Sequence, residues 1–186
     1  MNHSFLIAAS LAALSLAACH KNNDAQAPVT AEGTGDAMSA ATASPAANPA
    51  QVFADTAATS DAFEIQTSQL AVTKAQAPKV KQFAEAMIKA HTASTAKLKA
   101  AAAAASPAIT PAPTLTTAQQ QTLDALSAKS GAEFDRAYAD AQRTAHQATL
   151  DVLKAYSANG DVPSLKSFAT ELVPIVTAHL NMAKAL

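Results

Sequence analysis

One stretch of the sequence, from Ser130 to Asp161, has the pattern of a single long amphipathic helix and constrains the fold of the whole chain. Its apolar residues recur three or four positions apart, which predicts a buried stripe along one face. The predicted stripe consists of Phe134, Tyr138, Ala141, Ala145, Ala148, Val152 and Tyr156. His146 lies beside this stripe, near the middle of the helix. Such a helix needs partners that cover its apolar face, and the other apolar segments have the same helical period.

Local signals predict where this helix and its neighbours begin and end. Ser130 followed by Glu133 is typical of a capping box at the start of the long helix, and Asn159-Gly160 predicts a left-handed stop at its end. Similar signals elsewhere are Pro78 in a first turn, Thr116 with Gln119 as a capping box, and Asp161 as an N-cap followed by Pro163.

These signals divide the rest of the chain into further helices. One is predicted from about Pro49 to Gln76, a second from Pro78 to Ser106, and a last one from Pro163 to Leu186. Between them, the proline-rich segment from Ser106 to Leu115 predicts an extended crossover, and a short helix follows it and reaches Lys129. No segment alternates with the period of a strand. We therefore predict an all-α, ferritin-like four-helix bundle with a long crossover and a short extra helix between helices two and three.

The N-terminus has the pattern of a secretory signal. Residues 1–18 contain no charged side chain, and an apolar run ends in Leu16-Ala17-Ala18-Cys19, which resembles a bacterial lipobox. This resemblance implies that Cys19 is lipidated and becomes the first residue of the mature protein. His20 after it, rather than Asp, implies an outer-membrane lipoprotein that faces the periplasm. The alternative is an ordinary cleavable signal with an incidental Cys.

Composition separates a tether from a folded domain. Residues 19–50 are rich in Ala, Pro, Ser, Thr and Asn with almost no large apolar side chain, which predicts a disordered tether, whereas residues 51–186 are predicted to form the bundle. The chain has 13 basic and 14 acidic residues and a formal net charge of −1, so no basic surface for nucleic acid is expected. The membrane is the one partner that the sequence indicates, through Cys19; a protein partner is not indicated.

Four polar side chains lie on or beside the apolar stripes of the four long helices: Glu64, His91, His146 and His179. Glu64 and His91 lie nearly equally far from Pro78, so an antiparallel hairpin places them at one height. His146 and His179 differ by three residues in their distance from Asp161, or about 4 to 5 Å along a helix. Imidazole and carboxylate suit Zn²⁺, Cu²⁺ and Fe²⁺, so the four residues predict a candidate metal site.

Other chemistry is less well supported by the sequence. A ferritin-type di-iron centre requires Glu three residues before His, but the residues at those positions are Ile88, Arg143 and Val176. With Cys19 committed to lipid there is no Cys nucleophile, and no glycine-rich phosphate loop, serine elbow or haem-attachment motif is present.

Three interpretations of the buried polar residues follow. The favoured one is a non-enzymatic envelope protein in which Glu64, Tyr138, Gln142 and the histidines satisfy one another and fix the helix register. The alternative is a transition-metal-binding or metal-dependent redox protein that uses Glu64 and the three histidines, with Tyr138 and Gln142 as supporting residues. A third class, capture of a partner on an exposed helix face, has only the alanine run Ala100 to Ala105 as a candidate.

Three phrases, PKVKQFAEAMIKAH (Pro78 to His91), SGAEFDRAYADAQRTAH (Ser130 to His146) and SLKSFATELVPIVTAHLNMAKAL (Ser164 to Leu186), resemble the bacterial domain of unknown function 4142 family. The resemblance covers essentially the whole domain and implies a helical, ferritin-like fold in envelope proteins, with no established reaction. Glu64, His91, His146 and His179 match the family's helix-one carboxylate and its histidines. The family commonly has Asp directly before the helix-two histidine, where this chain has Ala90, so a supporting carboxylate is missing there.

Overall fold

The computed structural model describes residues 48–186, and this part of the chain is entirely helical. Its five helices are α1 (Pro49–Lys74), α2 (Pro78–Ala103), α3 (Thr117–Ser127), α4 (Gly131–Asn159) and α5 (Pro163–Lys184). No strand occurs in the described residues, which confirms the all-α prediction. None of these five helices has the length and apolar character needed to cross a membrane. The predicted signal, Cys19 and the tether up to residue 47 lie outside the described residues.

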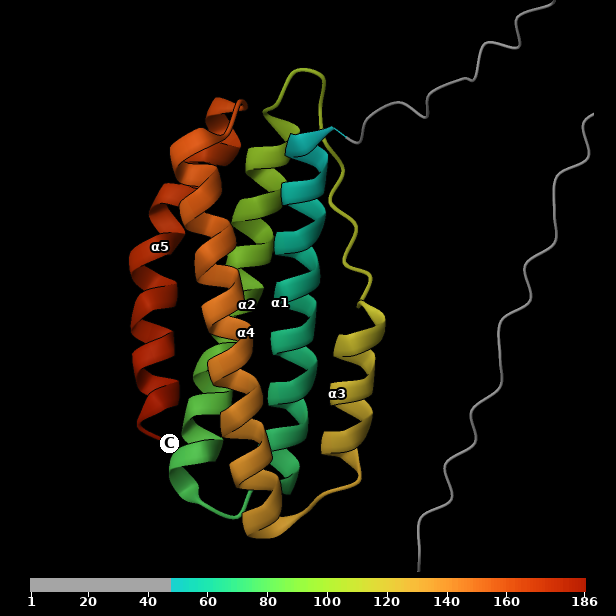
Figure 1. Cartoon of the computed structure of the whole chain (residues 1–186), viewed down its shortest axis with the longest axis vertical. Coiled ribbons are helices and arrows are strands. Elements are labelled where there is room, and N and C mark those ends of the chain that lie inside the picture. Colours follow the sequence, from blue (N-terminus) through green and yellow to red (C-terminus); the bar gives the residue numbers. More distant parts are fainter. Residues whose placement is uncertain (1–47) are drawn as a thin grey trace, which may run out of the picture. The chain divides into compact units, whose positions relative to one another are not determined.

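The four long helices form a bundle in which neighbours run antiparallel (Figure 1). α1 and α2 form one hairpin and α4 and α5 the other; α1 packs on α4, and α2 packs on α5. Because α2 and α4 run in the same direction, the segment between them returns along the length of the bundle and carries α3 on the outside (Figure 1). The chain therefore forms an all-α bundle with one long crossover and a short extra helix between its second and third long helices, as predicted.

Polar side chains of α1 hold the crossover against the bundle. Three of them, each about one turn apart, bind main-chain atoms of the crossover: Gln51 and Asp55 contact Thr110 and Ala112 at 2.8 Å each, and Thr59 contacts Thr114 at 2.9 Å. The capping box of Thr116 and Gln119 then starts α3, as predicted. The extended segment therefore satisfies its main chain without any strand partner.

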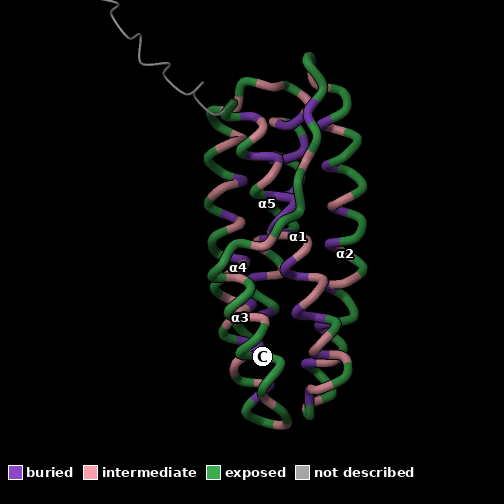
Figure 2. The backbone as a smooth tube through the Cα atoms, turned by 90° about the vertical axis from the view of Figure 1, so that its right-hand side faces the viewer, coloured by how far each residue is buried: buried purple, intermediate pink, exposed green. Residues whose placement is uncertain are grey.

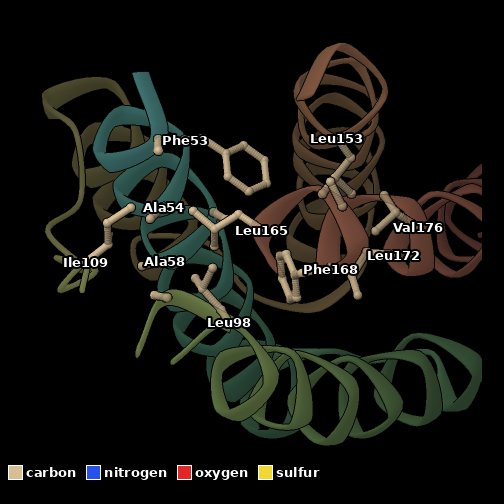
Figure 3. Packing of buried hydrophobic residues seen from close by; sticks show 14 of the residues in the cluster. Phe53, Ala54, Ala58, Leu98, Ile109, Leu153, Leu165, Phe168, Leu172 and Val176 are labelled. Carbon is tan, nitrogen blue, oxygen red and sulfur yellow. The ribbon is translucent and has the colours of Figure 1, made fainter. Parts of the chain in front are cut away.

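The apolar core consists of two clusters stacked along the bundle axis, visible as buried positions lining the inner faces of the helices in Figure 2. The first cluster includes Phe53, Leu98, Leu153, Leu165 and Phe168, several of which are drawn in Figure 3. The second cluster includes Phe83, Met87, Leu126, Phe134 and Tyr138. The residues between the two clusters on every long helix are the polar ones described in the next subsection.

The buried stripe of α4 is rotated from the predicted one. Phe134 and Tyr138 are buried as predicted, but the stripe continues through Gln142, His146, Leu150 and Leu153. The predicted alanines and Val152 instead line an open groove of about 750 Å³ between α1, α3 and α4. Burying the two leucines removes more apolar surface from water than burying the alanines, and this rotation brings His146 onto the stripe.

Both ends of α4 lie where they were predicted, but the predicted capping interactions do not form. Ser130 is the N-cap residue of α4, but its side chain makes no capping hydrogen bond, and the Glu133 side chain pairs with Lys129. Gly160 is extended at φ −61° rather than left-handed; a side chain there would meet the ring and carbonyl of Tyr156 at 2.5–2.6 Å. Glycine is therefore required at this helix end for close packing and not for its φ angle.

The start of α5 also differs from the prediction. Its N-cap is Val162, with no side-chain capping bond, while Asp161 accepts a hydrogen bond from the Tyr156 hydroxyl at 3.2 Å. Pro163, like Pro78 of α2, occupies the first turn as predicted. In the alanine run, Ala102 is fully buried and Ala101 and Ala105 pack against the first cluster, whereas Ala100, Ala103 and Ala104 are exposed.

Candidate metal centre

A layer of buried polar side chains separates the two apolar clusters. α1 contributes Asp61, Glu64, Thr67 and Ser68, α2 contributes His91 and Ser94, and α4 contributes Gln142 and His146. His179 of α5 lies at the same level and is half-buried. The hairpin geometry predicted from the sequence therefore does bring the four named residues to one height, although their contacts differ.

The three histidines face one another across the bundle from three different helices. His91, His146 and His179 each offer one ring nitrogen, and these three atoms all lie within 4.8 Å of one another. The ring centroids are 5.6 to 5.8 Å apart and the ring planes are inclined by 53° to 79°. Such an arrangement directs three lone pairs toward a common region of the core.

The opposite ring nitrogens are held by the protein. Nδ1 of His91 lies 2.8 Å from Oδ1 of Asp61, and Nδ1 of His146 lies 2.8 Å from the main-chain oxygen of Gln142. Both partners are acceptors, so each Nδ1 carries a proton and donates it. Nε2 of both rings, and Nδ1 of His179, are buried without a hydrogen-bond partner among the described residues. Buried polar atoms are rarely left in this state, and these three belong to one site.

Asp61 is the functional residue that the sequence analysis missed. Its second carboxylate oxygen accepts a hydrogen bond from Thr95 at 3.1 Å, so both oxygens are occupied. It lies one turn before Glu64 on the inward face of α1, and this spacing is the signal that could have identified it. The carboxylate that Ala90 lacks is thus supplied to His91 from a neighbouring helix.

Glu64 lies beside the histidine triad, but its carboxylate oxygens do not belong to the group of mutually close ligand atoms. It is 1% exposed, and neither carboxylate oxygen has a hydrogen-bond partner in the described part of the chain. Its Oε1 lies 3.5 Å from Nδ1 of His146, which already donates to Gln142. Burial raises the pKa of Glu64 to about 7, although the nearby His91 opposes this rise.

Burial also decides the charge of the histidines. Desolvation lowers the pKa of His146 to about 3 and that of His179 to about 4, with repulsion from His91 adding to both shifts. For His91 desolvation acts in the same direction, but the hydrogen bond that its Nδ1 donates to Asp61 and the negative charge of Glu64 outweigh it and raise the pKa of His91. At neutral pH two of the three rings are therefore neutral, which is the form that binds metal ions.

Tyr138 and Gln142, the predicted supporting residues, are both fully buried. The hydroxyl groups of Tyr138 and Ser68 form a hydrogen bond of 2.8 Å. The amide Nε2 of Gln142 donates a hydrogen bond of 3.2 Å to the hydroxyl of Thr67. Gln142 thus supports His146 through its main chain, whereas Tyr138 has no hydrogen bond to any of the three histidines. A network in which all these groups satisfy one another does not form, because six buried polar atoms of this layer have no partner in the described residues.

The donor set fits a borderline transition-metal ion. Three imidazole nitrogens suit Cu, Zn and Fe, and hydrogen-bonded Nδ1 protons fix the ring orientation as they do in metal sites. The described residues contain no further group of His, Cys, Asp and Glu with ligand spacing, so this layer is the candidate site.

Comparisons with known proteins agree with this fold. Residues 35–186 match the family described as "Domain of unknown function (DUF4142)". Two similar solved structures are "CopM in the Cu(II)-bound form", with a TM-score of 0.62, and "CopM in the Cu(I)-bound form", with a TM-score of 0.60. Each CopM chain is 18% identical in sequence to this chain, and the match covers 73% of this chain and 93% of the CopM chain. The likeness therefore concerns the fold alone. None of the curated proteins matches this sequence.

The buried carboxyl of Glu64 predicts a specific pH dependence of stability. Its folded-state pKa of about 7 lies above its usual value of 4.5, so ionisation in the folded protein carries a cost at pH 8 that is absent below pH 4.5. We expect Glu64→Gln in the metal-free protein to raise the free energy of unfolding at pH 8 by about 2–3 kcal/mol. This gain should disappear as the pH falls to 4.5.

Urea unfolding followed by circular dichroism at several pH values measures this difference. The exposed Glu85→Gln is the matched control and should show no such gain at pH 8. Protonation of His146 and His179 on acidification destabilises both proteins, so the two proteins are compared with each other at every pH. Equal stability of Glu64→Gln and the unsubstituted protein at pH 8 would show that Glu64 is not held in a costly ionised state.

Proposed function

Since the chain belongs to the DUF4142 family, whose description names no activity, we propose its function from its own residues: the bundle binds a copper ion through His91, His146 and His179. The observation that carries this proposal is the set of three buried ring nitrogens that face one another within 4.8 Å and have no hydrogen-bond partner in the described residues. An unpaired buried nitrogen costs free energy, and a shared metal ion satisfies all three at once.

Copper is favoured over the other ions by affinity and by the donors. Nitrogen sites bind divalent ions in an order that peaks at Cu²⁺, and imidazole also serves Cu⁺. The two similar structures are those of CopM with Cu(II) bound and with Cu(I) bound. Zn²⁺ and Fe²⁺ remain compatible with the same donors and are compared directly in the test below. We propose binding of the ion, and we assign no reaction to it.

We also propose that the protein is a lipoprotein of the bacterial envelope, carried there by the signal in residues 1–18 and anchored to the outer membrane through Cys19. A charge-balanced chain without a basic surface suits a domain held near a membrane by its anchor alone. The long tether would then leave the metal site free of the membrane surface.

The histidine triad makes a direct prediction for metal content. We expect the protein, purified without an affinity tag, to bind one Cu ion per chain more tightly than it binds Zn²⁺ or Fe²⁺. We expect each of the variants His91→Gln, His146→Gln and His179→Gln to lose most of the bound copper. Elemental analysis with competition titration measures both quantities. Glu64→Gln is the contrasting variant: it replaces a buried carboxylate by a neutral amide and keeps all three nitrogens, so one ion per chain should still bind, with a lower affinity than in the unsubstituted protein. A folded protein that takes up no metal under these conditions contradicts the proposal.

Asp61 is expected to act as a positioning residue for His91. In Asp61→Asn, an amide N–H can take the place of the carboxylate oxygen that accepts the hydrogen bond from His91. This change disturbs the tautomer of the His91 ring and lowers the basicity of its other nitrogen. We expect copper affinity to fall about 10–100-fold, in the range known for such supporting residues, with binding stoichiometry retained. Electron paramagnetic resonance of the Cu(II) form should report altered nitrogen coupling, a change that a purely structural role would not produce. The exposed Asp151→Asn is the control, and equal affinity of the two variants would exclude the positioning role.

Lipidation at Cys19 is tested independently of the metal. Cells grown with a labelled fatty acid should incorporate the label into the protein, and Cys19→Ser should abolish both the labelling and the recovery of the protein in the outer-membrane fraction. Ser15→Cys in the Cys19→Ser background controls for position, since a displaced Cys should not restore labelling. Labelled protein in the Cys19→Ser variant would refute the anchor.

A further inference from the structure

Beside the histidine triad lies a small cavity, and we propose that it receives a small uncharged diatomic molecule, of the carbon monoxide or dioxygen class, as an additional ligand of the bound metal. This inference rests on the proposed function, because it concerns the coordination position that the three histidines leave unfilled. It goes beyond that function because it gives the bound metal a ligand from outside the protein and sets a limit on the size of that ligand.

The protein offers three nitrogen ligands, so Cu(II), which favours a tetragonal ligand set, and a trigonal Cu(I) ion each keep a position for a fourth ligand. Structural metal sites close all four positions with protein groups, whereas sites with three protein ligands keep one position for an exogenous molecule. The remaining carboxylates do not close the fourth position. Both oxygens of Asp61 are hydrogen-bonded to His91 and Thr95, and Glu64 lies outside the group of mutually close ligand atoms.

The cavity has about the volume that a diatomic requires. It measures about 30 Å³ and is bounded by two of the ligand residues, His91 and His179. A void that holds one water needs about 10–15 Å³ on this measure. The cavity therefore accommodates one or two small molecules but no phosphate, carboxylic acid or peptide side chain.

Most of the remaining wall is apolar. Its apolar part is formed by Ala57 of α1, Leu153 of α4, and Phe168, Leu172 and Val176 of α5. Three polar residues, Asp61, Ser94 and Thr149, complete the lining, and the carboxylate of Asp61 repels an anion. Figure 3 shows Leu153, Leu172 and Val176 close together where α4 and α5 meet. An apolar wall cannot replace the hydration shell of an anion, so the surroundings favour a neutral and weakly hydrated ligand.

The cavity also reaches the protein surface. Its lining includes Ala90 of α2 and Ile175 of α5, and Ile175 is 37% exposed. Ala90 is half-buried, so these two residues place one side of the cavity near the surface between α2 and α5, and we infer that a small molecule enters there. Ala90 is significant in this position, because a larger or charged side chain at that residue would narrow the entrance or attract ions.

Carbon monoxide is the probe, because it binds Cu(I) and reports its environment through its stretching frequency. The full-length protein is loaded with Cu(I), its copper content is measured, and CO is added under infrared detection. We expect one sharp C–O band whose intensity follows the bound copper. We expect Ala57→Val, which adds two methyl groups to the cavity wall, to keep the copper and to weaken CO binding about tenfold or more. Ala86→Val, an exposed change of the same size on α2, should leave both unchanged.

A second measurement needs no variant. Methyl isocyanide should bind the Cu(I) protein, whereas tert-butyl isocyanide, which has the same donor atom but exceeds the cavity, should bind at least about tenfold more weakly. Equal binding of the two isocyanides, or copper-loaded protein that gives no CO band, would overturn the inference and leave the proposed copper site intact. Unchanged CO affinity in folded Ala57→Val would also overturn it. Failure of the unsubstituted protein to bind copper is the separate result that removes the proposed function itself.

Discussion

Desolvation of ionisable groups in the middle of the bundle is the constraint on which the rest of the structure depends. His146 and Glu64 are each 1% exposed and lie between two apolar clusters, where water cannot satisfy them. Burial holds His146 neutral and raises the pKa of Glu64, so the folded protein avoids a concentration of charge only by altering protonation. A layer of this kind costs stability, which the apolar clusters on both sides must offset. Its presence at one level of all four helices indicates a role other than stability.

α1 is the helix that connects this layer to the rest of the fold. It contacts each neighbour through a polar residue: Asp61 reaches His91 on α2, Ser68 reaches Tyr138 on α4, and Asp55 reaches the crossover. These contacts are directional, so they fix the height of α1 relative to its partners in a way that interchangeable alanines could not. The α1–α2 turn in its turn holds the start of α4, because Asp135 accepts hydrogen bonds from the main-chain N–H groups of Gln76 and Ala77. The alignment of the three histidines thus follows from several polar contacts spread along the bundle.

The sequence predicted the architecture and the height of the site, but not its contacts. Helical period and proline positions were sufficient for the helices, and the similar distances of Glu64 and His91 from Pro78 placed them correctly. Asp61 was missed because a lone acidic residue on a helix is usually solvated, and only the packing of α2 shows that it is 5% exposed. The stripe of α4 was misjudged because alanines and leucines share one period; their sizes, together with α3 covering one side, decide which face is buried. Gly160 likewise depends on a ring contact that no local pattern contains.

The two buried carboxylates of α1 differ in their hydrogen bonding. Asp61 has its charge compensated by hydrogen bonds on both oxygens, so it is useful with or without an ion. Glu64 has no such partner, and its ionisation in the metal-free protein is opposed by burial. Under the proposed function, neutral imidazoles bind a cation in the bundle core, where the dielectric constant is low and an uncompensated charge is costly. An ionised Glu64 beside His146 lowers that cost without occupying a coordination position. The same burial that penalises Glu64 in the empty bundle therefore strengthens its attraction to the cation, which gives a buried and unpaired carboxylate a physical reason to be there.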